Sequence, residues 1–347
     1  MKDMLSSSVS AMLNAFKSLS LAERKQVLVA LEAACEPADE KALIETKFVD
    51  GVVCPHCGAK EEEIKKNGHK GNRQRFLCKH CGKTFSATNN TVFYHTRKPL
   101  TIWKKYISCI MDGVTVRKAA GICGIHRNTA LLWRHKILNS LASVMDSVKM
   151  SGVVEADETY YRISYKGNHK RNKNWQMPRK ARKRGGDNHV RGISQQQVCV
   201  PCAITRKGLA VSRIACRGYA NAKAIGAVLG GHITEGATLC TDEGRGYLKF
   251  AADHNVNLVQ INAKKRIKGA YGIQCINAYH GKMRQFMERF NGVSTKFLNN
   301  YILWHNFVNH AKETASEKAR ILWNHLLSGG FSLTREGMYA GDIPVAA

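Results

Sequence analysis

The fold of the largest part of this chain is decided by an apolar run that ends on a carboxylate, Val154-Glu155-Ala156-Asp157-Glu158-Thr159. A second apolar run ends in the same way at Cys240-Thr241-Asp242-Glu243-Gly244. A third segment, Ile276-Asn277-Ala278-Tyr279-His280, opens a helical pattern. Short apolar runs of this kind predict strands. Two carboxylates at strand ends, far apart in the sequence, are what a protein needs to hold a pair of Mg²⁺ ions over a phosphodiester.

The segments around these runs predict a mixed sheet flanked by helices. Strands are expected at 152–161, 197–205, 208–216, 237–242 and 256–262. Helices are expected at 221–231, 246–254, 278–290 and 296–328. Strands that come first, then alternate with helices and give way to long helices, indicate one mixed domain, which we place at 150–328. The tail, 329–347, is expected to be weakly structured.

Asp157 and Asp242 are the candidate ligands for both magnesium ions. The best candidate for a third ligand is Asn277, whose amide oxygen can bind Mg²⁺ but carries no charge. Asn277 also fits a second role, as the N-cap of the helix that follows. Arg284 lies seven residues on, about two turns along the same helix face, where a cation can steady a phosphate. Glu288 is the alternative acid.

Two Cys-x-x-Cys pairs, separated by 20 residues, predict a zinc site in a ribbon domain at 50–97. The four ligands are Cys54, Cys57, Cys78 and Cys81. Gly58 and Gly82 follow the two pairs and can supply the open backbone geometry needed there. Arg73, Arg75, Lys79 and Lys83 surround the second pair. A zinc ion that is purely structural and a ribbon that also touches DNA remain equal alternatives.

Three helical patterns at 103–111, 116–123 and 126–138, with Gly124 in the turn before the last one, predict a helix-turn-helix domain at 98–145. Arg, Asn and Thr at a helix N-terminus are side chains that read base edges in the major groove. The candidate DNA contacts are Arg127, Asn128, Thr129, Arg134 and Lys136. The alternative is a small helical bundle that only packs.

The composition favours a polyanionic partner. The chain has 347 residues and a formal net charge of +28, and so large an excess costs self-repulsion in the fold. Twelve cysteines in a chain this long do not suggest a disulfide scaffold, which fits a reducing cytoplasm. No apolar run approaches the ~18 residues of a membrane span, and the N-terminus lacks a signal-peptide core.

Residues 1–49 are expected to be helical, with a capping box at Ser20 and Glu23 and a helix end at Pro37.

The positive charge is uneven along the chain. The insert 166–191 holds ten Lys and Arg and one acid. We expect the insert to contact phosphates through residues that include Lys180, Arg182, Lys183 and Arg184. A solvated basic loop is the alternative.

Over roughly residues 50–310, the order of these motifs resembles bacterial insertion-sequence transposases of the Asp-Asp-Glu/Asp superfamily, in a branch that uses Asp-Asp-Asn plus a basic residue. The most specific parts are the two aspartate motifs and the stretch 276–304. The resemblance implies a ribonuclease H-like core, two catalytic Mg²⁺ ions or Mn²⁺ in their place, and binding to terminal inverted repeats. It implies a metal-binding triad of Asp157, Asp242 and Asn277. Arg284 stands where the family commonly has Lys.

The sequence as a whole therefore predicts a multidomain α+β protein that cuts and joins double-stranded DNA. Hydrolysis at the element's end would free a 3′-hydroxyl, which would then attack target DNA. Two other functions remain open: a non-catalytic DNA-binding regulator descended from such an enzyme, and a Mg²⁺-dependent nuclease without joining activity. Because transposition usually needs two DNA ends held together, we expect a homodimer or larger assembly on DNA.

Overall fold

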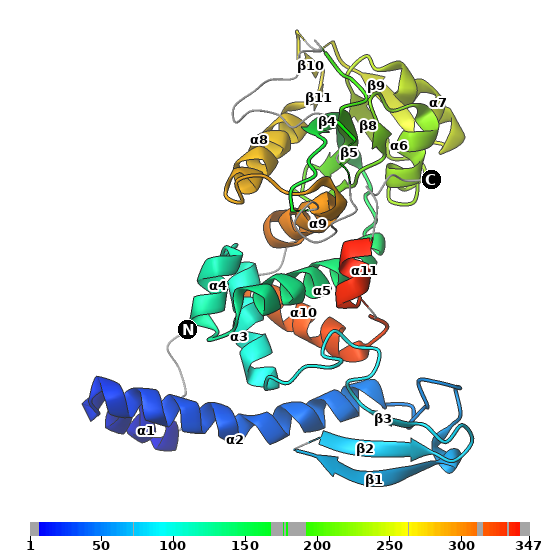
Figure 1. The fold of residues 1–347 in the computed structure, drawn as a ribbon. Helices are drawn as coiled ribbons and strands as arrows, with labels where there is room; N and C mark the ends of the chain where they lie inside the picture. The colour runs from blue at the N-terminus through cyan, green and yellow to red at the C-terminus, as the bar shows by residue number, and fades with distance from the viewer. Residues whose placement is uncertain are drawn as a thin grey trace. The chain divides into compact units, whose positions relative to one another are not determined.

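The chain forms two compact units, Met1–Ser108 with Trp323–Gly330, and Cys109–Leu322 with Phe331–Ala347. The computed structural model (Figure 1) describes residues 7–71, 73–167, 176, 178–179, 192–262, 264–310, 315–331 and 333–340. Most of the basic insert lies outside the described residues, and so do Lys180, Arg182, Lys183 and Arg184. Among the described helices, none is long and apolar enough to cross a membrane.

The first unit begins with α1 (Ser7–Ser18) and α2 (Leu21–Lys47). The predicted capping box is confirmed: the Glu23 N–H donates to Ser20 Oγ at 3.3 Å, and the Ser20 N–H donates to Glu23 Oε2 at 2.8 Å. The predicted helix end at Pro37 is wrong, because α2 continues to Lys47. Pro37 removes one N–H donor, but the alanine, glutamate and lysine residues on either side favour a helix strongly enough to carry it through.

A small antiparallel sheet follows in the order β1-β2-β3. A short 3₁₀ helix, η1 (Glu61–Glu63), precedes the sheet. The three strands are β1 (Ile64–Lys70), β2 (Arg73–Cys78) and β3 (Thr84–Ser86). Phe76 stacks on Phe85 with ring centroids 5.5 Å apart, and Phe48 meets Phe76 edge-on at 5.7 Å. So few apolar side chains make a marginal core, and folds of this size usually depend on a metal or another cross-link.

The three helices predicted after this sheet are present as α3 (Leu100–Met111), α4 (Val116–Ile122) and α5 (Arg127–Asp146). α5 runs eight residues beyond the pattern at 126–138. Gly124, in the turn before α5, has a φ of 59°, a conformation that glycine adopts without strain. Ala119 and Ala120 are buried where α4 packs on α5.

The second unit is built on a mixed sheet with strand order β6-β5-β4-β8-β9, and β7 also pairs with β5. The strands are β4 (Val153–Arg162), β5 (Gln197–Thr205), β6 (Ala210–Ser212), β7 (Cys216–Arg217), β8 (Thr238–Thr241) and β9 (Asn257–Gln260). β4 is antiparallel to β5 and parallel to β8, and β8 is parallel to β9. The strand predicted at 208–216 is two strands, because Ile214 donates its N–H to Asn299 Oδ1 at 2.8 Å and leaves the ladder.

Helices cover both faces of this sheet (Figure 1). α6 (Ala222–Leu229) and α7 (Arg245–Asp253) pack on one face, where Val154 and Ala156 join the buried core. α8 (Gln274–Glu288) and α9 (Thr295–His310) pack on the other. A short hairpin, β10 (Ile267–Lys268) with β11 (Tyr271–Gly272), precedes α8.

The C-terminal part of the chain departs from the sequence predictions in two places. The pattern at 296–328 is carried by two helices, α9 and α10 (Ala315–Ser328), and residues 311–314 between them lie outside the described ones. The tail contains a further short helix, α11 (Arg335–Ala340), within the stretch expected to be weakly structured.

The start of α8 is joined to β4 by Glu155. Alternation along the strand turns Glu155 away from the α6 and α7 side, where Val154 and Ala156 lie. The Glu155 side chain is buried, and its Oε2 accepts the backbone N–H of Ile276 at 3.0 Å. The cap residue of α8, Ile273, offers no side-chain hydrogen bond. Glu155 therefore satisfies one of the first N–H groups of the helix from a neighbouring strand, where a negative charge also suits the helix dipole.

We predict that Glu155→Leu lowers the free energy of unfolding of the second unit by about 1–3 kcal/mol, because it leaves the buried Ile276 N–H without an acceptor. Glu155→Gln keeps an acceptor oxygen and should cost less than Glu155→Leu. Urea unfolding of the full chain measures both. Equal losses for the two variants would show that the hydrogen bond is not what Glu155 contributes.

Candidate functional site

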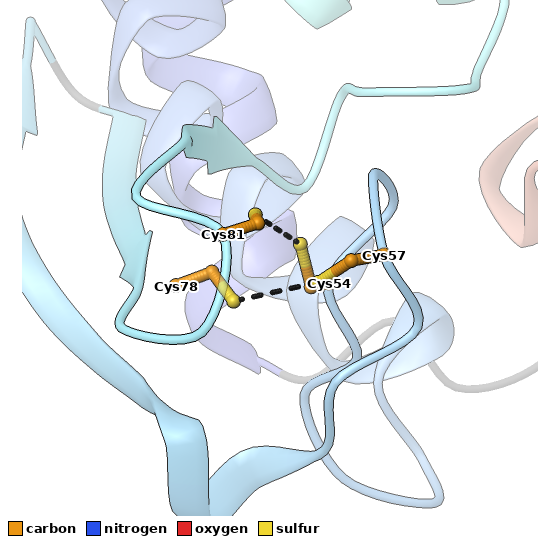
Figure 2. A group of neighbouring side chains, drawn as sticks. All are labelled: Cys54, Cys57, Cys78 and Cys81. Carbon is orange, nitrogen blue, oxygen red and sulfur yellow. Dashed lines mark hydrogen bonds between the residues drawn. The ribbon is translucent and has the colours of Figure 1, made fainter.

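The four predicted zinc ligands come together in the first unit. The sulfur atoms of Cys54, Cys57, Cys78 and Cys81 all lie within 4.8 Å of one another. Figure 2 shows the four side chains converging from two loops. The sulfurs of Cys54 and Cys81 are 3.7 Å apart, and so are those of Cys57 and Cys78. Gly58 and Gly82 have φ of 77° and 69°, and each donates its N–H to the carbonyl of the first cysteine of its pair.

This cluster fits a tetrahedral metal ion. Zinc–thiolate bonds of about 2.3 Å in a tetrahedron place the sulfurs about 3.7–3.8 Å apart, which is the spacing of the two closest pairs. Thiolate ligands select soft or borderline ions such as zinc. The cluster could therefore hold a zinc ion.

In the second unit, one predicted catalytic aspartate lies on β4 and the other directly follows β8, the parallel strand next to it. Val153 pairs with Thr238 and Glu155 with Cys240. The same register continued by two residues sets Asp157 beside Asp242, which directly follows β8. Neighbouring strands are about 4.8 Å apart, so the two carboxylates share one end of the sheet.

The electrostatics agree with this proximity. Burial, and after it the negative charge of Asp242, raise the pKa of Asp157 to about 6. Glu158 faces the other side of β4, as strand alternation predicts, and lies near Tyr247 of α7. Burial raises the pKa of Glu158 to about 7, and the charges of Asp157 and Asp242 act in the same direction. Three acids thus crowd one end of the sheet, and a divalent cation would relieve their repulsion.

Asp242 is fixed by the start of α7. Its Oδ1 accepts the N–H of Gly244 at 3.0 Å, and Gly244 is the N-cap of α7. A Cβ atom on Gly244 would lie 2.9 Å from the same oxygen. The glycine therefore leaves room for the carboxylate at the start of the helix.

The remaining candidates lie on α8. The proposal that Asn277 caps this helix is wrong, because α8 begins at Gln274 and its N-cap is Ile273. Asn277 lies inside the first turn with an exposed side chain, and Arg284, two turns on, is also exposed. Glu288, the alternative acid, is the last residue of α8 and is exposed as well.

His280, between Asn277 and Arg284, lies next to Asp157. Its Nδ1 lies 3.8 Å from Asp157 Oδ2. Burial, and then the charge of Arg284, lower the pKa of His280 to about 4, so the ring is neutral at pH 7 and the contact is not an ion pair. Since residues three and four apart share a helix face, the face that carries Asn277, His280 and Arg284 is the one turned to Asp157.

Sequence reasoning missed the part played by Glu155. The one available signal was its position two residues before Asp157, which puts both carboxylates on the same face of β4. An acid at that position can serve either the site or the helix above it, and the sequence does not show which.

The candidate DNA contacts of α5 separate into two groups. Arg127 and Asn128 are exposed at its first turn, and Thr129 is half-buried. Arg134 is fully buried, so its side chain is not on the surface that could read base edges, and its contact with DNA stays a prediction. Lys136 is half-buried, and burial lowers its pKa.

Comparison with known proteins finds similarity to transposases, and the family match lies within the second unit. Residues 149–307 match the family described as ISXO2-like transposase domain. A Halobacterium salinarum protein named "Uncharacterized protein in transposable element ISH50" is 22% identical over 263 residues, which cover 75% of this chain and 86% of that one. A chain of the solved structure "Crystal structure of a pre-cleavage Mos1 transpososome" matches with 8% identity over 66% of this chain and 79% of that chain, at a TM-score of 0.21, which is too low to bear on the fold. Residues 149–307 of this chain are therefore similar to the ISXO2-like transposase domain.

Proposed function

We propose that this protein is a DNA transposase that binds the ends of an insertion sequence, cuts the DNA strand there and joins it to target DNA. The observation that carries the proposal is the pairing of Asp157 and Asp242 at one end of the β4–β8 pair, inside a segment that matches a transposase domain. The strand order and directions of the sheet support a ribonuclease H-like core, in which three antiparallel strands are followed by two that run parallel to the first.

Asp157 and Asp242 would hold two Mg²⁺ ions, with Asn277 as a neutral third ligand. When bound, such ions activate an oxygen nucleophile and stabilise the leaving oxygen of the phosphodiester. Arg284 would steady a phosphate on the same helix face. The His280 ring lies next to Asp157 and is neutral at pH 7, so it leaves the negative charge of Asp157 available to a metal ion.

The parts outside the transposase domain would supply recognition. The exposed Arg127 and Asn128 at the start of α5 suit base reading in the major groove. The ribbon carries a groove of about 930 Å³ lined with basic side chains, among them Lys70, Arg73 and Arg97, which suits DNA contact as well as a structural role for zinc. The phosphate-contacting insert and the assembly of two or more chains on DNA stay predictions.

We expect Asp157→Asn and Asp242→Asn each to reduce cleavage of a labelled element end by more than about 100-fold, since even groups that only support a metal ligand are worth 10–100-fold. DNA binding should persist, because neither change removes a positive charge. Glu243→Gln, an exposed neighbour of Asp242, is the matched control and should cut normally. A parent chain that binds element ends but never cuts them, with any divalent ion, would favour the regulator; cutting without joining would favour the nuclease.

Asn277 gives the sharpest test of the ligand set. Because it does not cap α8, Asn277→Ala should change the free energy of unfolding by less than about 0.5 kcal/mol, as surface changes do. It should nevertheless abolish cleavage, while Asn277→Asp should retain it and bind Mg²⁺ at least as tightly. Cleavage assays across a Mg²⁺ titration measure both, with the exposed Gln285→Ala on the same helix as control. Near-normal turnover by Asn277→Ala would move the third ligand to Glu288.

For the ribbon, we predict one zinc ion per chain, measurable by elemental analysis of dialysed protein. Structural zinc supplies about 10–16 kcal/mol of apparent binding energy, so Cys78→Ser should lose both the zinc and the protease resistance of residues 50–90. Cys216→Ser, which changes a cysteine outside the cluster, should lose neither. A protease-resistant ribbon in parent protein that contains no zinc would refute the assignment.

A further inference from the structure

A groove of about 700 Å³ lies within the second unit, where the starts of α4 and α5 meet the turn between α8 and α9. Its basic lining residues are Arg117, Arg127, Arg134, Lys166, Arg289 and Lys296. All of its lining residues are described, and none of them is an Asp or a Glu. A concave surface with one sign of charge concentrates ions of the opposite sign, so the groove suits an anion.

The floor of the groove is a buried guanidinium. Arg134 is 0% exposed, yet no ion pair to it occurs among the described residues. Its Nη2 donates to the Val114 carbonyl, and its guanidinium carbon lies 4.8 Å from the centre of the Trp304 ring. Nε and Nη1 are buried without a well-formed hydrogen bond among the described residues, and the Tyr301 hydroxyl is a polar but uncharged neighbour of the guanidinium. A buried charge with unsatisfied donors is strongly destabilising unless something binds it.

The opposite wall is a turn held in a fixed shape. Asn291 and Gly292 have φ of 50° and 88°. Lys166 Nζ donates to their carbonyls at 2.9 and 2.8 Å, which ties the turn to the chain that follows β4. α9 begins just after this turn, at Thr295. The N-termini of α5 and α9 therefore border the same groove, and helix N-termini favour anions.

We propose that this groove binds one phosphate of the DNA backbone, with Arg134 as its buried partner. The proposal rests on the proposed function and adds to it a contact that joins the DNA-reading helix to the transposase domain. A planar guanidinium with two open donors matches the geometry of a phosphate. The DNA is the occupant that the position favours, because a strand read by Arg127 and Asn128 must run past the start of α5.

The test is the salt dependence of binding to a fluorescein-labelled duplex of random sequence, measured by anisotropy between 50 and 200 mM NaCl. Each phosphate contact contributes about 0.9 to the slope of log K against log salt. Arg134→Met should make the slope shallower by about that amount. Arg289→Gln and Arg117→Gln change exposed residues and should each make the slope shallower by a smaller amount. These two variants test the groove even if Arg134→Met does not fold. Lys249→Gln, exposed on α7 and outside the groove, should match the parent.

Thermal unfolding separates this contact from a structural role for Arg134. If the guanidinium is compensated only when a phosphate binds, Arg134→Met should be at least as stable as the parent chain in the absence of DNA. It should also gain less stability than the parent when the duplex is added. Lower stability without DNA together with an unchanged salt slope would overturn the proposal. So would stabilisation of the parent by a polyglutamate peptide and not by the duplex, which would indicate an acidic protein partner. A parent chain that binds no duplex at all would instead refute the proposed function.

Discussion

The buried Glu155 carboxylate accepts the N–H of Ile276, and the geometry of the candidate catalytic site depends on that contact. β4 supplies Asp157 two residues further along the same face, and α8 begins where Glu155 holds it. Because β4 and α8 are joined at this point, the face of α8 that carries His280 lies next to Asp157. A carboxylate can satisfy a buried helix N-terminus more firmly than a neutral side chain can, because its charge also meets the helix dipole.

A second set of contacts fixes α8 about one turn further along, at Tyr279. Tyr279 donates to Asn306 Oδ1 at 2.6 Å, and Asn306 Nδ2 donates to Ser212 Oγ at 3.0 Å. These three buried residues join α8, α9 and β6. Because a half-satisfied buried network is costly, the helix has one favourable position on the sheet. Rigid support of this kind is what a metal site needs, since small displacements of its ligands cost activity.

Residue pattern predicted the elements of the second unit well, because alternation and apolar runs are local signals. β4 and β5 lie within a residue of their predicted bounds, and the cysteine spacing alone located the metal cluster. The failures have tertiary causes. The strand at 208–216 was split by an acceptor from α9, and α8 began before Asn277 because Glu155, far away in the sequence, supplied its cap. At Pro37 the local signal itself was misleading: a proline usually ends a helix, but α2 continues through it to Lys47.

Arg134 is the most informative of the predicted DNA contacts, because the sequence pattern did not show that the fold buries it. The chain thus carries unbalanced charge of both signs at two places. Acids crowd the point where the pairing of β4 with β8 ends, and there burial and the charge of Asp242 raise the pKa of Asp157. A guanidinium with buried donors lies in the groove beside the α8–α9 turn. Contacts within the folded chain neutralise neither the acids nor the guanidinium. A metal cation would neutralise the acids and a phosphate would neutralise the guanidinium, and DNA with bound metal ions supplies both partners.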